Sequence, residues 1–264
     1  MHGYSLERAL EGISKAGFRN IELGANDHCS HVSGETVTDS AIKQLQRGLA
    51  DYGLQIVSLS SHVNLAGRTR EDGFRQVRRL KSGIDLAKKL GCKYVITGPG
   101  EVETDEQTGR FFENIRATID YCEREDIIIG LETHGKLTAT AEACREVLSR
   151  LHSKHIGINY DTANVIYYGG VRPEEDVVKI ADKVVHVHAK DHIGGKGEYD
   201  FPAIGDGDID FRAVFSALRT VDYGGPYSVE VEFRGPCTVD GPEIVDEALG
   251  KSFRKLTEIT KHGQ

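Results

Sequence analysis

Short apolar runs alternate with longer amphipathic segments along the whole chain of 264 residues. Several short runs are apolar at nearly every position, such as Ile127-Ile128-Ile129, which is typical of parallel strands buried on both faces. The pattern predicts seven strands, at Arg19–Leu23, Leu54–Ser60, Tyr94–Gly98, Ile127–Thr133, Ile156–Thr162, Val184–Lys190 and Tyr227–Phe233.

The longer segments carry apolar residues at helical spacing. In the segment that ends at Leu90, Val77, Leu80, Ile84 and Ala87 recur every three or four positions. Because strand and helix alternate and no break in composition marks a linker, we expect a parallel α/β fold, a (β/α)₈ TIM barrel formed as one domain by residues 1–264. Eight helices are expected, including those at Ser5–Ala16, Glu71–Leu90, Thr104–Arg124, Thr140–Leu151, Pro173–Lys183, Phe211–Val221 and Pro242–Thr260.

This count is one strand short of a closed eight-stranded barrel. The chain opens directly with the Ser5–Ala16 helix, and the four residues before it are too few and too polar for a strand. We therefore expect that the first strand is missing, or that the native start lies upstream of Met1. A gap should separate Arg19–Leu23 from Tyr227–Phe233 or be filled by another chain. Either arrangement favours a homo-oligomer, because association buries two strand edges.

Composition narrows the classes of partner. A net charge of -8 disfavours nucleic acid, since phosphates are neutralised by Lys and Arg. No apolar run reaches the length of a membrane span, and the N-terminus lacks the apolar region of a signal peptide, so we expect a cytoplasmic protein without membrane contact.

The scattered cysteines suggest inert, reduced thiols rather than disulfides, at Cys29, Cys92, Cys122, Cys144 and Cys237.

Polar side chains end the last four predicted strands. Barrel enzymes carry their catalytic groups at the carboxyl ends of strands, and these ends hold Glu132, Asp161, His188 and either Glu230 or Glu232. Any one of them could be structural, but four consecutive strands that each supply an oxygen or nitrogen favour a metal site. Three carboxylates and one imidazole suit one divalent ion, Mn²⁺, Mg²⁺, Co²⁺ or Zn²⁺, with positions left for substrate oxygens.

Alternation along a strand adds neighbours to this set. Residues two apart share a face, so His186 points the same way as His188, and His134 the same way as Glu132. The member of each pair that does not bind the ion is expected to orient a ligand or to contact substrate.

The motifs resemble those of the xylose-isomerase-like superfamily of sugar phosphate isomerases and epimerases, which includes the tagatose 3-epimerase group, inosose dehydratase and endonuclease IV. The resemblance covers essentially the whole chain and implies one metal ion, with Mn²⁺ as the first candidate, held by Glu132, Asp161, His188 and Glu230. The spacing from Tyr223 favours Glu230 over Glu232. The strongest matches are Leu-Glu-Thr-His-Gly, Tyr-Asp-Thr-Ala-Asn, His-Val-His-Ala-Lys-Asp and Tyr-Gly-Gly-Pro-Tyr-Ser-Val-Glu-Val-Glu-Phe.

Two positions depart from the epimerase pattern that this resemblance implies. Asn164 stands where the epimerases usually carry His, and Gly194 where they usually carry Arg. Both family residues contact substrate, so the identity of the sugar stays open. The additional His ligands of endonuclease IV are also missing: one candidate strand ends in Ser61-His62, but the next ends in Gly98-Pro99-Gly100. DNA repair is therefore disfavoured.

The resemblance implies a metal-dependent isomerase or epimerase that acts through an enediolate, with Glu132 and Glu230 as the acid/base pair. The same chemistry with a leaving group would give a lyase or dehydratase acting on a keto-sugar or cyclitol. A noncatalytic barrel that binds sugar or metal is an alternative from another class. The expected substrate contacts are His62, His134, Asn164, His186 and Lys190.

Overall fold

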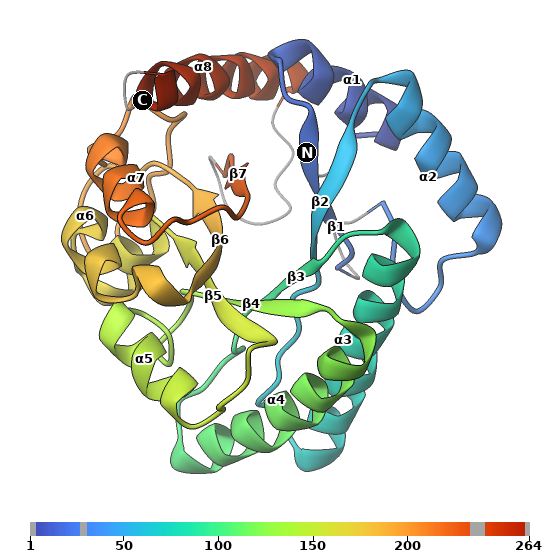
Figure 1. Cartoon of the computed structure of the whole chain (residues 1–264), viewed down its shortest axis with the longest axis vertical. Helices are drawn as coiled ribbons and strands as arrows, with labels where there is room; N and C mark the ends of the chain where they lie inside the picture. The colour runs from blue at the N-terminus through green and yellow to red at the C-terminus, as the bar shows by residue number, and fades with distance from the viewer. Residues whose placement is uncertain (1–3, 27–30, 233–240, 262–264) are drawn as a thin grey trace.

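Seven parallel strands form one sheet that curves into a nearly closed barrel inside a ring of helices (Figure 1). The computed structural model describes residues 4–26, 31–232 and 241–261. Sheet order follows chain order, as expected for repeated strand–helix units. The strands are β1 (Asn20–Gly24), β2 (Gln55–Ser60), β3 (Tyr94–Thr97), β4 (Ile128–Glu132), β5 (Ile156–Asp161), β6 (Val184–Ala189) and β7 (Tyr227–Val229).

Hydroxyl side chains begin most of the helices. Thr38, Thr69, Thr104 and Thr140 each accept a hydrogen bond from a backbone N–H in the first turn, and Ser5 does so for the first helix. Such caps satisfy amide groups that a helix leaves without an internal partner. The helices are α1 (Leu6–Ala16), α2 (Asp39–Asp51), α3 (Arg70–Leu90), α4 (Asp105–Glu125), α5 (Ala141–Ser149), α6 (Pro173–Asp176), α7 (Phe211–Arg219) and α8 (Pro242–Lys261).

The prediction of one continuous helix over Pro173–Lys183 is wrong. Only α6 is α-helical, and two 3₁₀ turns, Val177–Lys179 and Ala181–Lys183, complete the segment. The carboxylate of Asp176 accepts hydrogen bonds from the backbone N–H of Ala141 and from the hydroxyl of Tyr160. These contacts, with burial of the apolar side chains that follow, hold the segment in a tighter and irregular path.

The barrel is interrupted between its first and last strands. Among the described residues, β1 pairs only with β2, and β7 pairs only with β6, so the predicted gap is confirmed there. Phe233, the last residue of the predicted strand, lies outside the described residues. The helices close the ring over the gap, because α1 and α8 lie side by side and Arg8 forms an ion pair of 2.6 Å with Asp246 (Figure 1).

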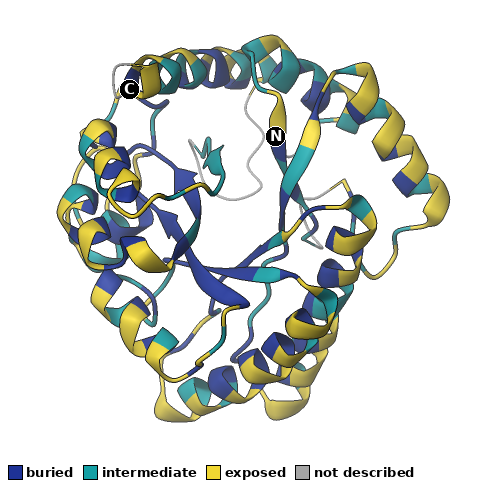
Figure 2. Cartoon of the chain, viewed as in Figure 1, coloured by how far each residue is buried: buried dark blue, intermediate teal, exposed yellow. Residues whose placement is uncertain are grey.

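Strands β3 to β6 are mostly buried inside the ring, β1, β2 and β7 beside the gap are partly exposed, and the helices expose their outer faces (Figure 2). Cys92, Cys122 and Cys144 are free and buried, and burial raises the pKa of the Cys122 thiol to about 12, which keeps it unreactive. Cys29 and Cys237 lie outside the described residues. No helix in the described part of the chain is long and apolar enough to cross a membrane.

Candidate functional site

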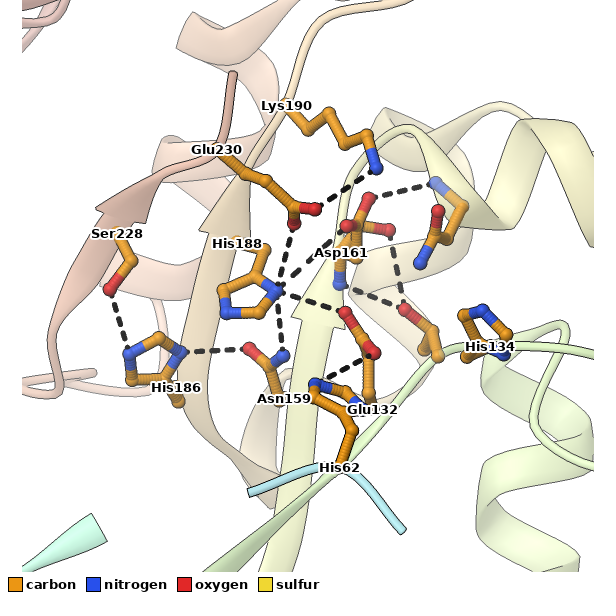
Figure 3. Close-up of polar contacts among 12 residues, drawn as sticks. His62, Glu132, His134, Asn159, Asp161, His186, His188, Lys190, Ser228 and Glu230 are labelled. Atoms are coloured by element: carbon orange, nitrogen blue, oxygen red, sulfur yellow. Dashed lines mark hydrogen bonds and ion pairs between the residues drawn. The ribbon is translucent and has the colours of Figure 1, made fainter. Parts of the chain in front are cut away.

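The four predicted ligands lie together at one rim of the barrel (Figure 3). Glu132 and Asp161 are the last residues of β4 and β5, His188 is the penultimate residue of β6, and Glu230 directly follows β7. Nδ1 of His188 lies 2.9 Å from Oε1 of Glu132, 3.2 Å from Oε2 of Glu230 and 3.9 Å from Oδ2 of Asp161. One ligand atom from each of the four lies within 4.8 Å of every other.

Two carboxylate oxygens of this cluster have no hydrogen-bond partner among the described residues, Oδ2 of Asp161 and Oε2 of Glu230. The other oxygen of Asp161 accepts the backbone N–H groups of Ala163 and Asn164, both at 2.8 Å, which fixes the orientation of the carboxylate. A buried oxygen left without a donor is costly unless a cation or a ligand satisfies it. The arrangement therefore has the ligand atoms and the free oxygen lone pairs that a cation site requires.

Burial and neighbouring charges shift the pKa values of the cluster. Burial raises the pKa of Asp161 well above its usual value; Lys190 opposes this shift, whereas Glu230 and Glu132 add to it. Burial also disfavours the charge of Glu230, but attraction to Lys190 and His188 outweighs it and holds the Glu230 pKa well below its usual value. A divalent cation at this place would favour the ionised form of all three carboxylates.

A second polar layer lies deeper in the barrel, two residues before the predicted ligands of β5, β6 and β7. It consists of Asn159, His186 and Ser228, and Gly130 occupies the equivalent position in β4. Nδ1 of His186 lies 2.8 Å from Oδ1 of Asn159, and its Nε2 lies 3.0 Å from Oγ of Ser228 (Figure 3). His186 is fully buried, and it is not among the described residues that line the cavity above.

Glu22 connects the four-residue cluster to the deeper polar layer, and it was not predicted from the sequence. Its Oε1 lies 2.9 Å from Nε2 of His188, and its Oε2 accepts a hydrogen bond of 2.8 Å from Ser58. The signal in the sequence is a lone carboxylate between Ile21 and Leu23 in an apolar strand, where an unpaired charge would be costly.

A cavity of about 1570 Å³ opens above the cluster and continues through the barrel to α1 and α8 beside the gap. Of the expected substrate contacts, His62, His134, Asn164 and Lys190 line it. The predictions omitted an aromatic set on the same wall, consisting of Tyr167, Tyr168, Tyr199 and Phe201.

The conformation after β5 explains part of this aromatic wall. Val165–Gly169 form a π-helical turn, a form that occurs mostly as single turns and often at functional sites. Tyr167 and Tyr168 both line the cavity from this turn, and the hydroxyl of Tyr168 lies 2.8 Å from Nε2 of His134. This contact holds the imidazole of His134 near the cluster.

Gly194 lies in a tight turn of the loop after β6. Its φ of +101° favours glycine, and a Cβ added there would lie 2.0 Å from Oε2 of Glu198. The same oxygen accepts the backbone N–H of Gly195 at 2.7 Å. Because the loop turns tightly here, an arginine at position 194 would not fit without rearrangement.

Comparisons with known proteins agree with the barrel fold. A sequence model described as a xylose isomerase-like TIM barrel matches residues 10–256. The inosose dehydratase of Geobacillus kaustophilus is 24% identical over 262 residues, covering 87% of this chain and 80% of that enzyme. The structure also resembles two solved structures, whose likeness establishes the fold.

The first is a D-tagatose 3-epimerase-like protein, with a TM-score of 0.77 and 23% identity over 95% of this chain and 91% of that chain. The second is a xylose isomerase-like TIM barrel protein from Mycobacterium smegmatis in complex with magnesium. Its TM-score is 0.76 at 20% identity, over 96% of this chain and 88% of that chain.

Proposed function

The chain belongs to the xylose isomerase-like TIM barrel family, and we propose that it is a divalent-metal-dependent isomerase or epimerase of a sugar or sugar phosphate. The observation that carries this proposal is the convergence of Glu132, Asp161, His188 and Glu230 around a buried carboxylate oxygen, Oδ2 of Asp161, that has no hydrogen-bond partner among the described residues. A structural cluster of charges would be expected to satisfy its own lone pairs.

The residues present fit one divalent ion. Three carboxylates and one imidazole nitrogen are the donors that Mn²⁺ or Mg²⁺ takes, and Zn²⁺ or Co²⁺ would also accept them. We propose Mn²⁺ as the resident ion. The related barrel from Mycobacterium smegmatis was crystallised with magnesium, which supports a hard divalent cation in general.

Proton transfer is assigned to the two glutamates. When bound, the ion would supply Lewis-acid polarisation of a substrate carbonyl, which acidifies the adjacent C–H. Glu132 and Glu230 approach the cavity from β4 and β7, with two strands between them, so each can reach a different side of a small molecule. For epimerisation, one glutamate would remove the proton and the other, in its protonated form, would deliver a proton to the opposite face of the same carbon; for isomerisation, the glutamate that removed the proton would return it to the neighbouring carbon.

The remaining lining residues are proposed to hold the sugar. His62, His134, Asn164 and Lys190 present polar groups to the cavity, whereas the aromatic wall presents apolar faces. Such a combination suits a sugar ring, which has hydroxyl groups at its edge and C–H groups on its face.

A dehydratase acting on a keto-sugar or cyclitol is the second candidate. Position 194, where the epimerases usually carry arginine, is a glycine with a φ of +101°, and one relative is an inosose dehydratase. Such a reaction would remove the same activated proton and then release a hydroxyl group as water. It would need only a proton donor close to that hydroxyl group.

Incubation in D₂O separates these activities. The purified protein with added Mn²⁺ would be incubated with a panel of keto-sugars and inososes, and the products followed by NMR and mass spectrometry. Deuterium uptake with formation of the isomer or epimer supports the proposal, and loss of water identifies the dehydratase instead. Metal binding without exchange into any compound would contradict both and indicate a noncatalytic barrel. Asp161→Asn is the control, because it keeps the size of the side chain and removes one proposed ligand.

A further inference from the structure

We propose that Glu22 is a positioning residue, which accepts the Nε2–H of His188 and thereby presents Nδ1 of the same ring to the metal ion. This inference rests on the proposed function, because it takes Glu132, Asp161, His188 and Glu230 as the ligand set. It assigns a role to the first strand of the structure, which supplies none of the four ligands.

The orientation of the His188 ring carries the argument. Nδ1 faces the three carboxylates of the cluster, whereas Nε2 points the opposite way and lies 2.9 Å from Oε1 of Glu22. An ionised carboxylate can only accept hydrogen bonds, so without an ion either ring nitrogen can donate to the carboxylate that it faces; once an ion replaces the proton on Nδ1, the remaining proton lies on Nε2 and is accepted by Glu22. The lone pair then remains on Nδ1, the nitrogen that faces the site. A ring held in this orientation does not have to rotate to bind an ion.

Glu22 is itself held by groups from three other strands. Ser58 of β2 donates to its Oε2 at 2.8 Å, Ser228 of β7 donates at 3.3 Å, and Nε2 of His186 lies 3.0 Å away. The contact with Ser228 crosses the gap, where β1 and β7 have no backbone pairing among the described residues. The carboxylate is therefore fixed on both sides of the interruption in the barrel.

Glu22, His186 and His188 could instead be read as a second metal site, because their ligand atoms also lie within 4.8 Å of one another. The contacts disfavour it. Both ring nitrogens of His186 have partners, Asn159 at 2.8 Å and the two serines at 3.0 Å and 3.1 Å. A cation there would also require His188 to bridge two metal ions, at the cost of the contact that orients it.

Cadmium binding to the unmodified protein tests the orientation directly. With ¹¹³Cd²⁺ as the probe, a proton–cadmium correlation spectrum should show coupling to Hε1 of His188 and not to its Hδ2, because Nδ1 is the ligand. The signal is assigned by its loss in His188→Asn. Coupling to Hδ2, or a second bound cadmium, would overturn the proposal in favour of the deeper site. No cadmium binding at all would remove the proposed metal centre together with this inference.

Variants separate positioning from the metal centre itself. Glu22→Leu removes both acceptor oxygens and should weaken Mn²⁺ binding by about 10-fold to 100-fold, as expected for a partner of a histidine ligand. Glu22→Gln keeps one acceptor oxygen and should recover part of the affinity. Ser58→Ala is the matched control, because it removes a contact of Glu22 but leaves the Glu22–His188 pair.

The affinities would be measured by calorimetric titration, with circular dichroism to confirm that each variant is folded. Equal affinities for Glu22→Leu, Ser58→Ala and the wild type would refute the positioning role while leaving the metal centre intact. Should the leucine variant fail to fold, the cadmium spectrum of the unmodified protein and the Glu22→Gln titration still decide the question.

Discussion

The ammonium group of Lys190 donates to Oε1 of Glu230, with 3.2 Å between Nζ and the oxygen. The Lys190 side chain is only 4% exposed and the Glu230 side chain is 34% exposed, but Oε2 of Glu230 itself is shielded from solvent. The pairing turns the other oxygen of Glu230 toward Nδ1 of His188, 3.2 Å away. One cation thus compensates a partly buried carboxylate and orients it toward the cluster.

This relationship predicts different outcomes for two glutamates that lie two residues apart. Glu230→Gln should abolish turnover and strongly weaken metal binding, because an amide is a poor substitute for a carboxylate ligand. Glu232 forms an ion pair with Lys190 and its side chain lies outside the four-residue cluster, so Glu232→Gln should leave Mn²⁺ affinity nearly unchanged. Metal titration and activity assays of both variants check this. The reverse pattern would mean that the final strand is assigned with a register error of two residues.

Metal affinity should rise with pH. In the metal-free protein burial raises the pKa of Asp161, and for His188 the attraction of Glu22 and Glu132 outweighs burial, so its pKa is also raised. Below these raised values both groups hold protons that an incoming ion must displace. Affinity should therefore increase as pH passes upward through them and become constant once both are deprotonated. Calorimetry in two buffers of different ionisation enthalpy would measure the proton release, and binding without release across this range would contradict the prediction.

In the loop after β6, substitution should be tolerated at Gly195 but not at the preceding residue, Gly194. Gly194→Ala forces a side chain into a positive φ and against Glu198, which should lower the free energy of unfolding by about 1–3 kcal/mol. Gly195→Ala is the matched control, because an added Cβ would lie 4.0 Å from its nearest neighbour, and its effect should stay within about 0.5 kcal/mol. Denaturant unfolding compares the two variants, and equal effects would show that the backbone at Gly194 is no more constrained than at Gly195.

The interrupted barrel predicts self-association. β1 and β7 each have one edge without a backbone partner among the described residues, and such edges favour pairing with another chain. We expect the purified protein to form a homo-oligomer, measured as molar mass by light scattering after size-exclusion chromatography. A single-chain mass over the accessible concentration range would contradict this expectation.

Much of the site can be predicted from local sequence because strands alternate with a period of two. Glu132, Asp161 and His188 each stand near the carboxyl end of an apolar run, and parallel strands bring such ends to the same rim. The four proposed ligand positions therefore follow from pattern and resemblance together. His186, by contrast, lies buried beneath His188 and does not line the cavity. The sequence predicts the face of the strand on which His186 lies, but only the folded barrel shows how deep in the interior it is.

The sequence by itself determined the alternation of strands and helices, the shortage of one strand, and the residue types at the rim, since each depends on neighbours along the chain. Only the tertiary structure decided that Glu22 meets His188, two residues 166 positions apart. That contact requires the sheet to curve until β1 faces β6, and the register of β1 shifts between Ile21 and Glu22. The aromatic wall and the broken α6 segment have the same origin. Their geometry depends on packing between distant segments, for which no local periodicity exists.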